Sequence, residues 1–89
     1  MTKTETLREL EEIAKKLSYE ISYEALKKTA PYVKSGLVKL EERKMILIEK
    51  GLNTDRKIAV ILNVIQDEKL DGVFVKPYIK QVIASYKNR

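Results

Sequence analysis

The fold is decided by residues 36–65, which read GLVKLEERKMILIEKGLNTDRKIAVILNVI. The polar residues 41–43 separate two extended runs, 37–40 and 44–49, and this spacing predicts a β-hairpin. The second run is apolar at consecutive positions from Met45 to Ile48, so we expect its strand to be central in the sheet or covered on both faces.

A helix is predicted at 54–66, directly after Gly51 ends the second strand of the hairpin. Its N-cap is Asn53 or Thr54, and Asp55 places a negative charge at the positive end of the helix dipole. Apolar residues lie almost all around this helix, namely Ile58, Ala59, Val60, Ile61, Leu62, Val64 and Ile65. We expect such a helix to be either the buried centre of the domain or part of a subunit interface.

Weaker hydrophobic patterns before residue 36 and after residue 65 predict the remaining elements. Apolar residues recur every three or four positions from Leu7 to Leu17, which predicts an amphipathic helix capped by Thr4 or Thr6. The other predicted segments are a strand at 18–23, a helical turn at 23–28, a short extended piece at 73–75 and a last helix from Pro77. The predicted fold is therefore a single α+β domain over 1–89, ordered α-β-β-β-α-(β)-α, with an antiparallel hairpin sheet packed by helices.

The composition excludes several classes of function. The 89 residues contain no cysteine, histidine or tryptophan, which excludes a thiol nucleophile, a Ser-His-Asp triad and a His/Cys zinc site. We therefore expect a protein that is not an enzyme and that holds neither a cofactor nor a metal. The charged start and the lack of a long apolar run favour a cytoplasmic chain that does not enter a membrane. The abundance of Lys, Glu and Ile over Asn and Gln is typical of thermophile proteins.

Four of the five tyrosines fall at core-facing positions of the predicted elements. Tyr19 and Tyr23 share one side of the predicted strand at 18–23, and Tyr78 and Tyr86 lie on the apolar stripe of the last helix. Tyr32 is the one whose position leaves its ring free.

The net charge of +5 favours anionic partners, and nucleic acid is one of them. The basic excess lies in 30–50, with five bases and three acids, and in 68–89, with five bases and two acids. A helix, three antiparallel strands and a helix are also the skeleton of double-stranded-RNA-binding domains, although the glycine and the full lysine run of their second helix are missing here. The candidate contacts to nucleic acid are Lys34, Lys39, Arg43, Lys44, Arg56 and Lys57.

The stretch from Gly36 to Ile65 also resembles the N-terminal part of zinc metallopeptidases of the ImmA/IrrE type. The similarity is in the spacing of an apolar strand, a short polar cap at 52–54 and the helix that follows. In those enzymes this helix carries His-Glu-x-x-His, but here residues 61–65 read ILNVI, without a metal ligand. The resemblance therefore implies a related fold without the zinc site, and no catalytic residue is carried over.

The remaining hypothesis is a structural or interaction protein that self-associates as a homodimer. A chain this short buries only about 60–65% of its unfolded surface, so a helix that is apolar all round is hard to cover from within. A hairpin also leaves a strand edge that another copy can pair with. We expect Met45, Leu47 and Ile48 to lie at the interface, because that run is apolar on both faces of its strand.

Overall fold

The computed structural model describes residues 1–29 and 34–88 and confirms a small, compact α+β domain. Its elements, in chain order, are α1 (Lys3–Lys16), β1 (Tyr19–Glu24), α2 (Leu26–Thr29), β2 (Gly36–Leu40), β3 (Arg43–Glu49), α3 (Thr54–Ile65) and α4 (Pro77–Lys87).

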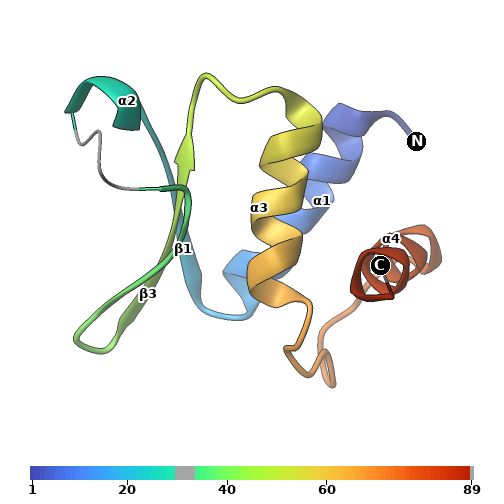
Figure 1. Ribbon diagram of the computed structural model, residues 1–89. Coiled ribbons are helices and arrows are strands. Elements are labelled where there is room, and N and C mark those ends of the chain that lie inside the picture. Colours follow the sequence, from blue (N-terminus) through green and yellow to red (C-terminus); the bar gives the residue numbers. More distant parts are fainter. Residues whose placement is uncertain (30–33, 89) are drawn as a thin grey trace.

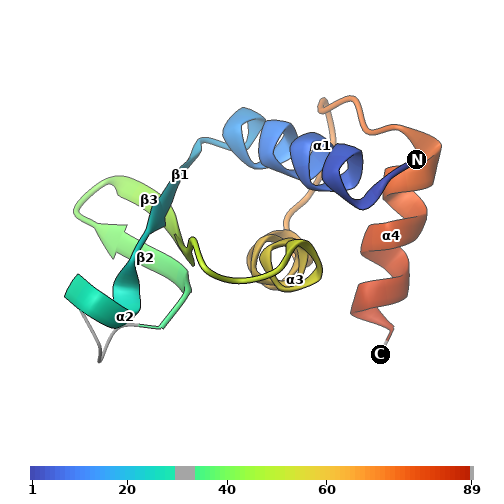
Figure 2. The ribbon, with the colours of Figure 1, turned by 90° about the horizontal axis from the view of Figure 1, so that it is seen from above.

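The domain has three layers. The sheet forms one side, α1 and α3 cover one face of it, and α4 packs on the far side of these two helices (Figures 1 and 2). Of the described helices, only the short α2 lies on the opposite side of the sheet, where it packs against β3 near the end of that strand (Figures 1 and 2).

The strands pair in the order β1-β3-β2, so β3 is central as its apolar sequence predicts. The β2–β3 hairpin is antiparallel, with Val38 opposite Met45. β1 pairs parallel to β3, so the sheet is mixed, and the three antiparallel strands of the double-stranded-RNA-binding skeleton are not present. The reason is that the chain leaves β1 at one end of the sheet, returns along β2, and reaches β3 running in the direction of β1 again.

The core lies between the sheet and α1 and α3, and it continues between these two helices and α4. Its largest fully buried side chains come from every layer: Leu10, Ile46, Ile48, Ile61, Ile65 and Ile79. α3 is central, as the sequence indicates, but it is not buried on all sides. Ile61, Leu62 and Ile65 are buried, whereas the other apolar residues of α3 are only half-buried.

Local backbone features fix the ends of the elements. Thr2, and not Thr4 or Thr6, caps α1 by accepting a hydrogen bond from the Glu5 amide, and Asn53 caps α3. Ser18 joins α1 to β1 with φ +72°, a left-handed conformation that allows the tight turn between them.

Residues 73–75 and two of the tyrosines differ from expectation. Residues 73–75 form no strand, because there is no neighbouring strand for them to pair with; Val75 is buried, but Phe74 is 73% exposed. Tyr19 is buried and Tyr86 half-buried as predicted, whereas Tyr23 and Tyr78 are exposed, because each lies at the margin of its packed face. Tyr32 lies outside the described residues.

Candidate interaction surfaces

The face of the sheet that points away from α1 and α3 carries an apolar centre. Because Ile46 and Ile48 point to the helices, the alternation of a strand turns Met45 and Leu47 outward. The register of the sheet places residues of β2 beside them on the same face. We call this group the outer patch; it consists of Val38, Leu40, Met45 and Leu47.

The charged groups around the outer patch already have partners within the chain. Arg43 donates two hydrogen bonds to Glu20, at 2.8 Å and 3.0 Å, and this contact lowers the pKa of the Glu20 carboxyl. Glu49 accepts hydrogen bonds from the amides of Leu26 and Lys27 at the start of α2. The outer face therefore offers an apolar centre inside a rim whose charges are largely satisfied.

β2 is an edge strand with little protection against pairing. Leu37 is 41% exposed and Leu40 is 49% exposed, and the strand carries one charge, Lys39. The other edge, β1, presents Glu20 and Glu24 in alternation, which is a common defence against edge-to-edge contact. The apolar edge and the outer patch adjoin each other, since Val38 and Leu40 belong to both.

The structure separates the three residues that the sequence assigns to an interface. Met45 and Leu47 lie in the outer patch, half-buried. Ile48 is 0% exposed and points into the core, so it is not available on this face. Leu37 and Leu40 are exposed on the edge strand β2 and were not among the predicted interface residues, although the run LVKL at 37–40 is mostly apolar.

The six candidate contacts to nucleic acid fall at opposite ends of the sheet. Lys39, Arg43 and Lys44 lie near the hairpin turn, and the rest lie where β3 ends and α3 begins. Within the first group, Arg43 is paired with Glu20, and the Lys44 Nζ lies 4.3 Å from the centre of the Tyr19 ring. In the second group, the Lys57 Nζ lies 5.5 Å from the centre of the Tyr23 ring.

A different set of bases gathers at the end of the sheet where α2 and α3 begin. We call it the basic end; it consists of Lys27, Lys28, Lys34, Lys50 and Arg56, all exposed and without an ion pair among the described residues. Nearby acids are engaged: Asp55 pairs with Lys3 at 2.9 Å, and Glu24 accepts a hydrogen bond from Ser22. This end therefore presents unpaired positive charge, which Lys34 and Arg56 alone did not indicate.

Two tyrosine hydroxyls bind carboxylates. The Tyr19 hydroxyl donates to Glu68 at 2.5 Å, and its burial together with that contact raises the pKa of Tyr19 to about 12. The Tyr23 hydroxyl donates to Glu11. Partial burial of Tyr23 is the larger cause, and this hydrogen bond the smaller one, of a raised pKa of the Tyr23 hydroxyl. Both hydroxyls stay protonated at neutral pH and tie the sheet to neighbouring segments, so neither is a base.

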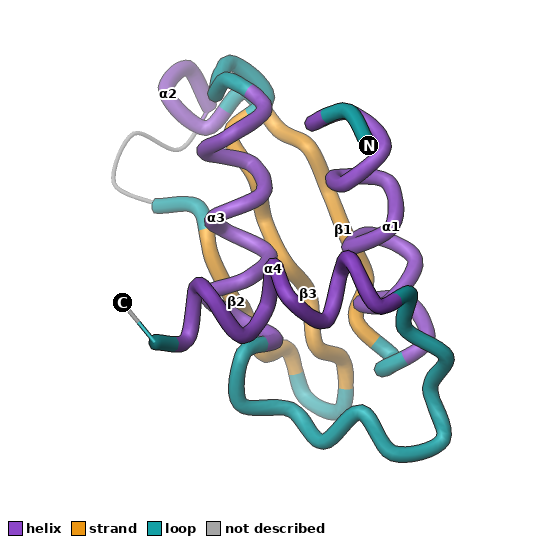
Figure 3. Tube along the Cα trace, turned by 90° about the vertical axis from the view of Figure 1, so that its right-hand side faces the viewer, coloured by secondary structure: helices purple, strands orange, loops and turns teal. Residues whose placement is uncertain are grey.

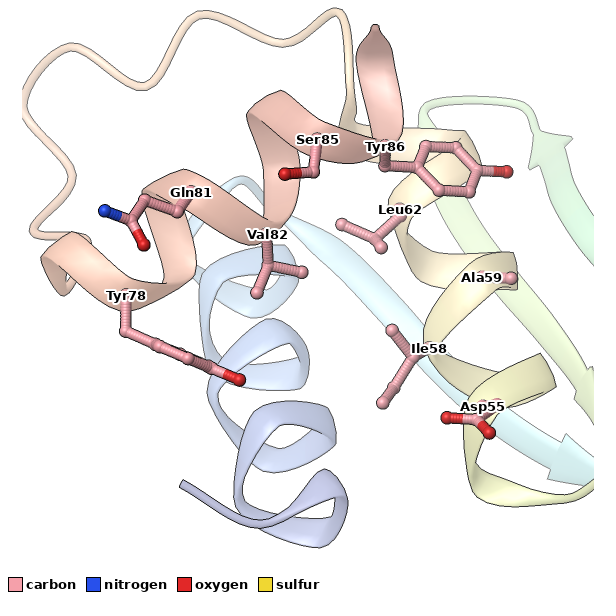
Figure 4. Close-up of a pocket in the computed structure, with 9 residues that line it drawn as sticks. All are labelled: Asp55, Ile58, Ala59, Leu62, Tyr78, Gln81, Val82, Ser85 and Tyr86. Atoms are coloured by element: carbon pink, nitrogen blue, oxygen red, sulfur yellow. The ribbon is translucent and has the colours of Figure 1, made fainter. Parts of the chain in front are cut away.

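A groove of about 610 Å³ lies between α3 and α4 (Figure 4). Ile58, Leu62 and Val82 point into it from the two helices, and polar groups such as Gln81 and Ser85 lie on α4 at its side. Its size is in the range of small-molecule sites. Among the described residues, no group of three or more acids or other ligands is placed to hold a metal.

In the described ranges, no helix is both long and apolar enough to cross a membrane. Comparison with protein-family models, with curated proteins and with solved structures returns no match. The resemblance of 36–65 to the ImmA/IrrE-type metallopeptidases therefore stays a prediction.

Proposed function

We propose that this chain is a non-enzymatic protein-interaction domain that self-associates through the outer patch and the adjoining edge of β2. The observation that supports this most is that, among the described residues, only the short α2 lies on the outer side of the sheet (Figure 1), while the outer patch and the β2 edge carry apolar side chains that are half-buried or exposed. A soluble protein that exposes apolar side chains on a face and at an edge of its sheet is expected to bury them against a partner.

The charge pattern favours a second copy over a strongly charged partner. Arg43, Glu20 and Glu49 in the rim of the outer patch are already engaged within the chain, so these three groups offer little charge for a partner to neutralise. An apolar surface with a satisfied rim is complementary to itself. Symmetric association through the same surface on both copies is the common arrangement of homodimers.

Sedimentation of the wild-type chain and of two lysine variants tests this proposal. The wild type is expected at twice 10.3 kDa at micromolar concentration. Leu40→Lys should lower the mass to that of a monomer with an unchanged circular dichroism spectrum, because the exposed side chain contributes little to the core. The matched control is Phe74→Lys, which alters a more exposed apolar side chain away from the sheet and should leave the dimer intact. A wild-type mass of 10.3 kDa up to high micromolar concentration would refute self-association.

A second candidate function is binding of a nucleic-acid backbone at the basic end. The support for it is that the bases there lack ion pairs while nearby acids are engaged, and that α1 and α3 both begin at this end, with the positive ends of their dipoles. Retardation of mixed RNA and DNA at two salt concentrations tests it. We expect Lys28→Glu to weaken a salt-sensitive shift more than Lys80→Glu on α4 does. Absence of any shift at low salt would eliminate this candidate.

A further inference from the structure

We infer that two copies join edge to edge through β2, antiparallel, so that their sheets form one six-stranded sheet. The inference rests on the proposed self-association and assigns it to the β2 edge, with a second copy of this chain as the partner; the two outer patches then lie side by side on one face of the joined sheet and are not buried against each other. The alternative is a face-to-face dimer in which the outer patches pack directly on each other.

The first argument is the contrast between the two edges of the sheet. An edge strand presents unpaired backbone amides and carbonyls, and proteins usually protect such an edge with charges, prolines or a bulge. β1 has this protection in Glu20 and Glu24, whereas β2, with the sequence GLVKL, has only Lys39 and pairs continuously with β3 from Gly36 to Leu40. The unpaired amides and carbonyls at the β2 edge can bind an extended strand, and β2 of a second copy is such a strand.

The second argument is the area that each way of joining two copies can bury. The outer face of three strands spans about 15 Å by 20 Å, from the usual strand spacing and rise. Each partner in a standard interface buries about 800 Å², which exceeds this face. An edge-to-edge dimer adds contacts in the helical layer, because the helices of both copies then lie on the same side of the joined sheet.

The sequence of β2 selects one register. A two-fold axis at Val38 sets Val38 against the same residue of the second copy, Leu37 against Lys39, and Gly36 against Leu40, so all five residues pair. Moving the axis to Lys39 would set two lysines directly opposite each other, which is destabilising. Moving it to Leu37 would leave Leu40 without a partner in β2. The register centred on Val38 is therefore the one that β2 favours.

The helical layer is compatible with this dimer. α3 lies over β2 and β3 and contacts both (Figure 3), so the two copies of α3 would run antiparallel about 10 Å apart, close to the usual distance of packed helices. α1, α4 and the sheet occupy the other sides of α3, so its remaining flank faces the second copy. That flank carries Arg56, Val60 and Asn63 at helical spacing, with Arg56 and Asn63 exposed. A two-fold axis that passes near the middle of α3 would set Arg56 opposite Asn63 of the second copy, so that like charges would not oppose each other.

Disulfide trapping tests the register directly, because the chain contains no cysteine of its own. Val38→Cys sets two thiols on directly opposed residues, within the Cα separation that a disulfide allows. Under mild oxidation most of this variant should become a covalent dimer. Leu37→Cys and Lys39→Cys should each cross-link poorly alone, since diagonal neighbours are about 7–8 Å apart, and should cross-link efficiently when mixed.

The outcomes separate this inference from the proposed function. A sedimenting dimer without a Val38→Cys cross-link, or with Met45→Cys cross-linking best, would overturn the edge-to-edge geometry and leave self-association standing. A wild-type chain that sediments as a monomer would overturn both. Preservation of the wild-type circular dichroism spectrum in each variant shows that the cross-links report on the folded protein, and a Ser22→Cys variant on β1 is the matched control that should not cross-link.

Discussion

Replacing Ile61 by alanine should destabilise the domain more than any exposed apolar substitution. Ile61 is 0% exposed and belongs to the cluster that joins α3 to α1 and to β3. The change removes three carbon atoms, worth about 0.8 kcal/mol each, and leaves a cavity, so we expect a loss of about 3–4 kcal/mol. A domain of this length has a free energy of unfolding of roughly 4–13 kcal/mol, so the loss is a large fraction of the total.

Urea and thermal denaturation, followed by circular dichroism at one fixed protein concentration, measure this effect. The expected fall in Tm is roughly 12–32 °C, since 1 kcal/mol corresponds to about 4–8 °C in a domain of this size. The control is Phe74→Ala, which removes more atoms from a side chain that is 73% exposed and should cost less than about 1 kcal/mol. Equal, small losses for the two variants would show that α3 is not at the centre of the core.

Three further changes follow from local contacts. The free energy of unfolding should fall as the pH rises from 10 towards 12, because the unfolded chain releases the Tyr19 proton near pH 10 while the folded chain holds it to about 12. Tyr19→Phe, measured by urea denaturation across this range, should show a shallower fall, and an identical slope would contradict the raised pKa of Tyr19 in the folded chain. Ser18→Gly should raise the free energy of unfolding by about 0.5–1 kcal/mol, because glycine adopts φ +72° without strain; a loss on chemical denaturation would argue against this turn. Asn53→Ala should cost about 1 kcal/mol, because its side chain accepts a hydrogen bond from the Arg56 amide at the start of α3, and no change in Tm would show that this cap is not formed.

The sequence predicted the elements whose patterns are long and self-consistent. The hairpin and α3 were predicted because the apolar run from Met45 to Ile48 identifies a central strand, and because the stretch after Gly51 combines a cap with helical periodicity. The parallel pairing of β1 was not predictable, since the direction of a strand depends on how the chain crosses the sheet and not on its own alternation.

The candidate surfaces were predicted only in part, because they depend on which face a residue takes. Ile48 and Leu47 are both apolar residues of the same run, so the sequence does not distinguish them. Adjacent residues of a strand point to opposite faces, and the helices cover the face of Ile48. The bases of 30–50 were expected to act together, but the hairpin carries Lys39 and Lys44 away from Lys34. Tertiary placement decided both outcomes.

Hydrogen exchange of the β2 amides at low and high protein concentration tests the central claim most directly. If two copies pair through this strand, the amides of Gly36–Leu40 that point away from β3 should become protected as the concentration rises, while those on the free edge of β1 should not change. Exchange at β2 that is fast and independent of concentration would contradict self-association through this edge.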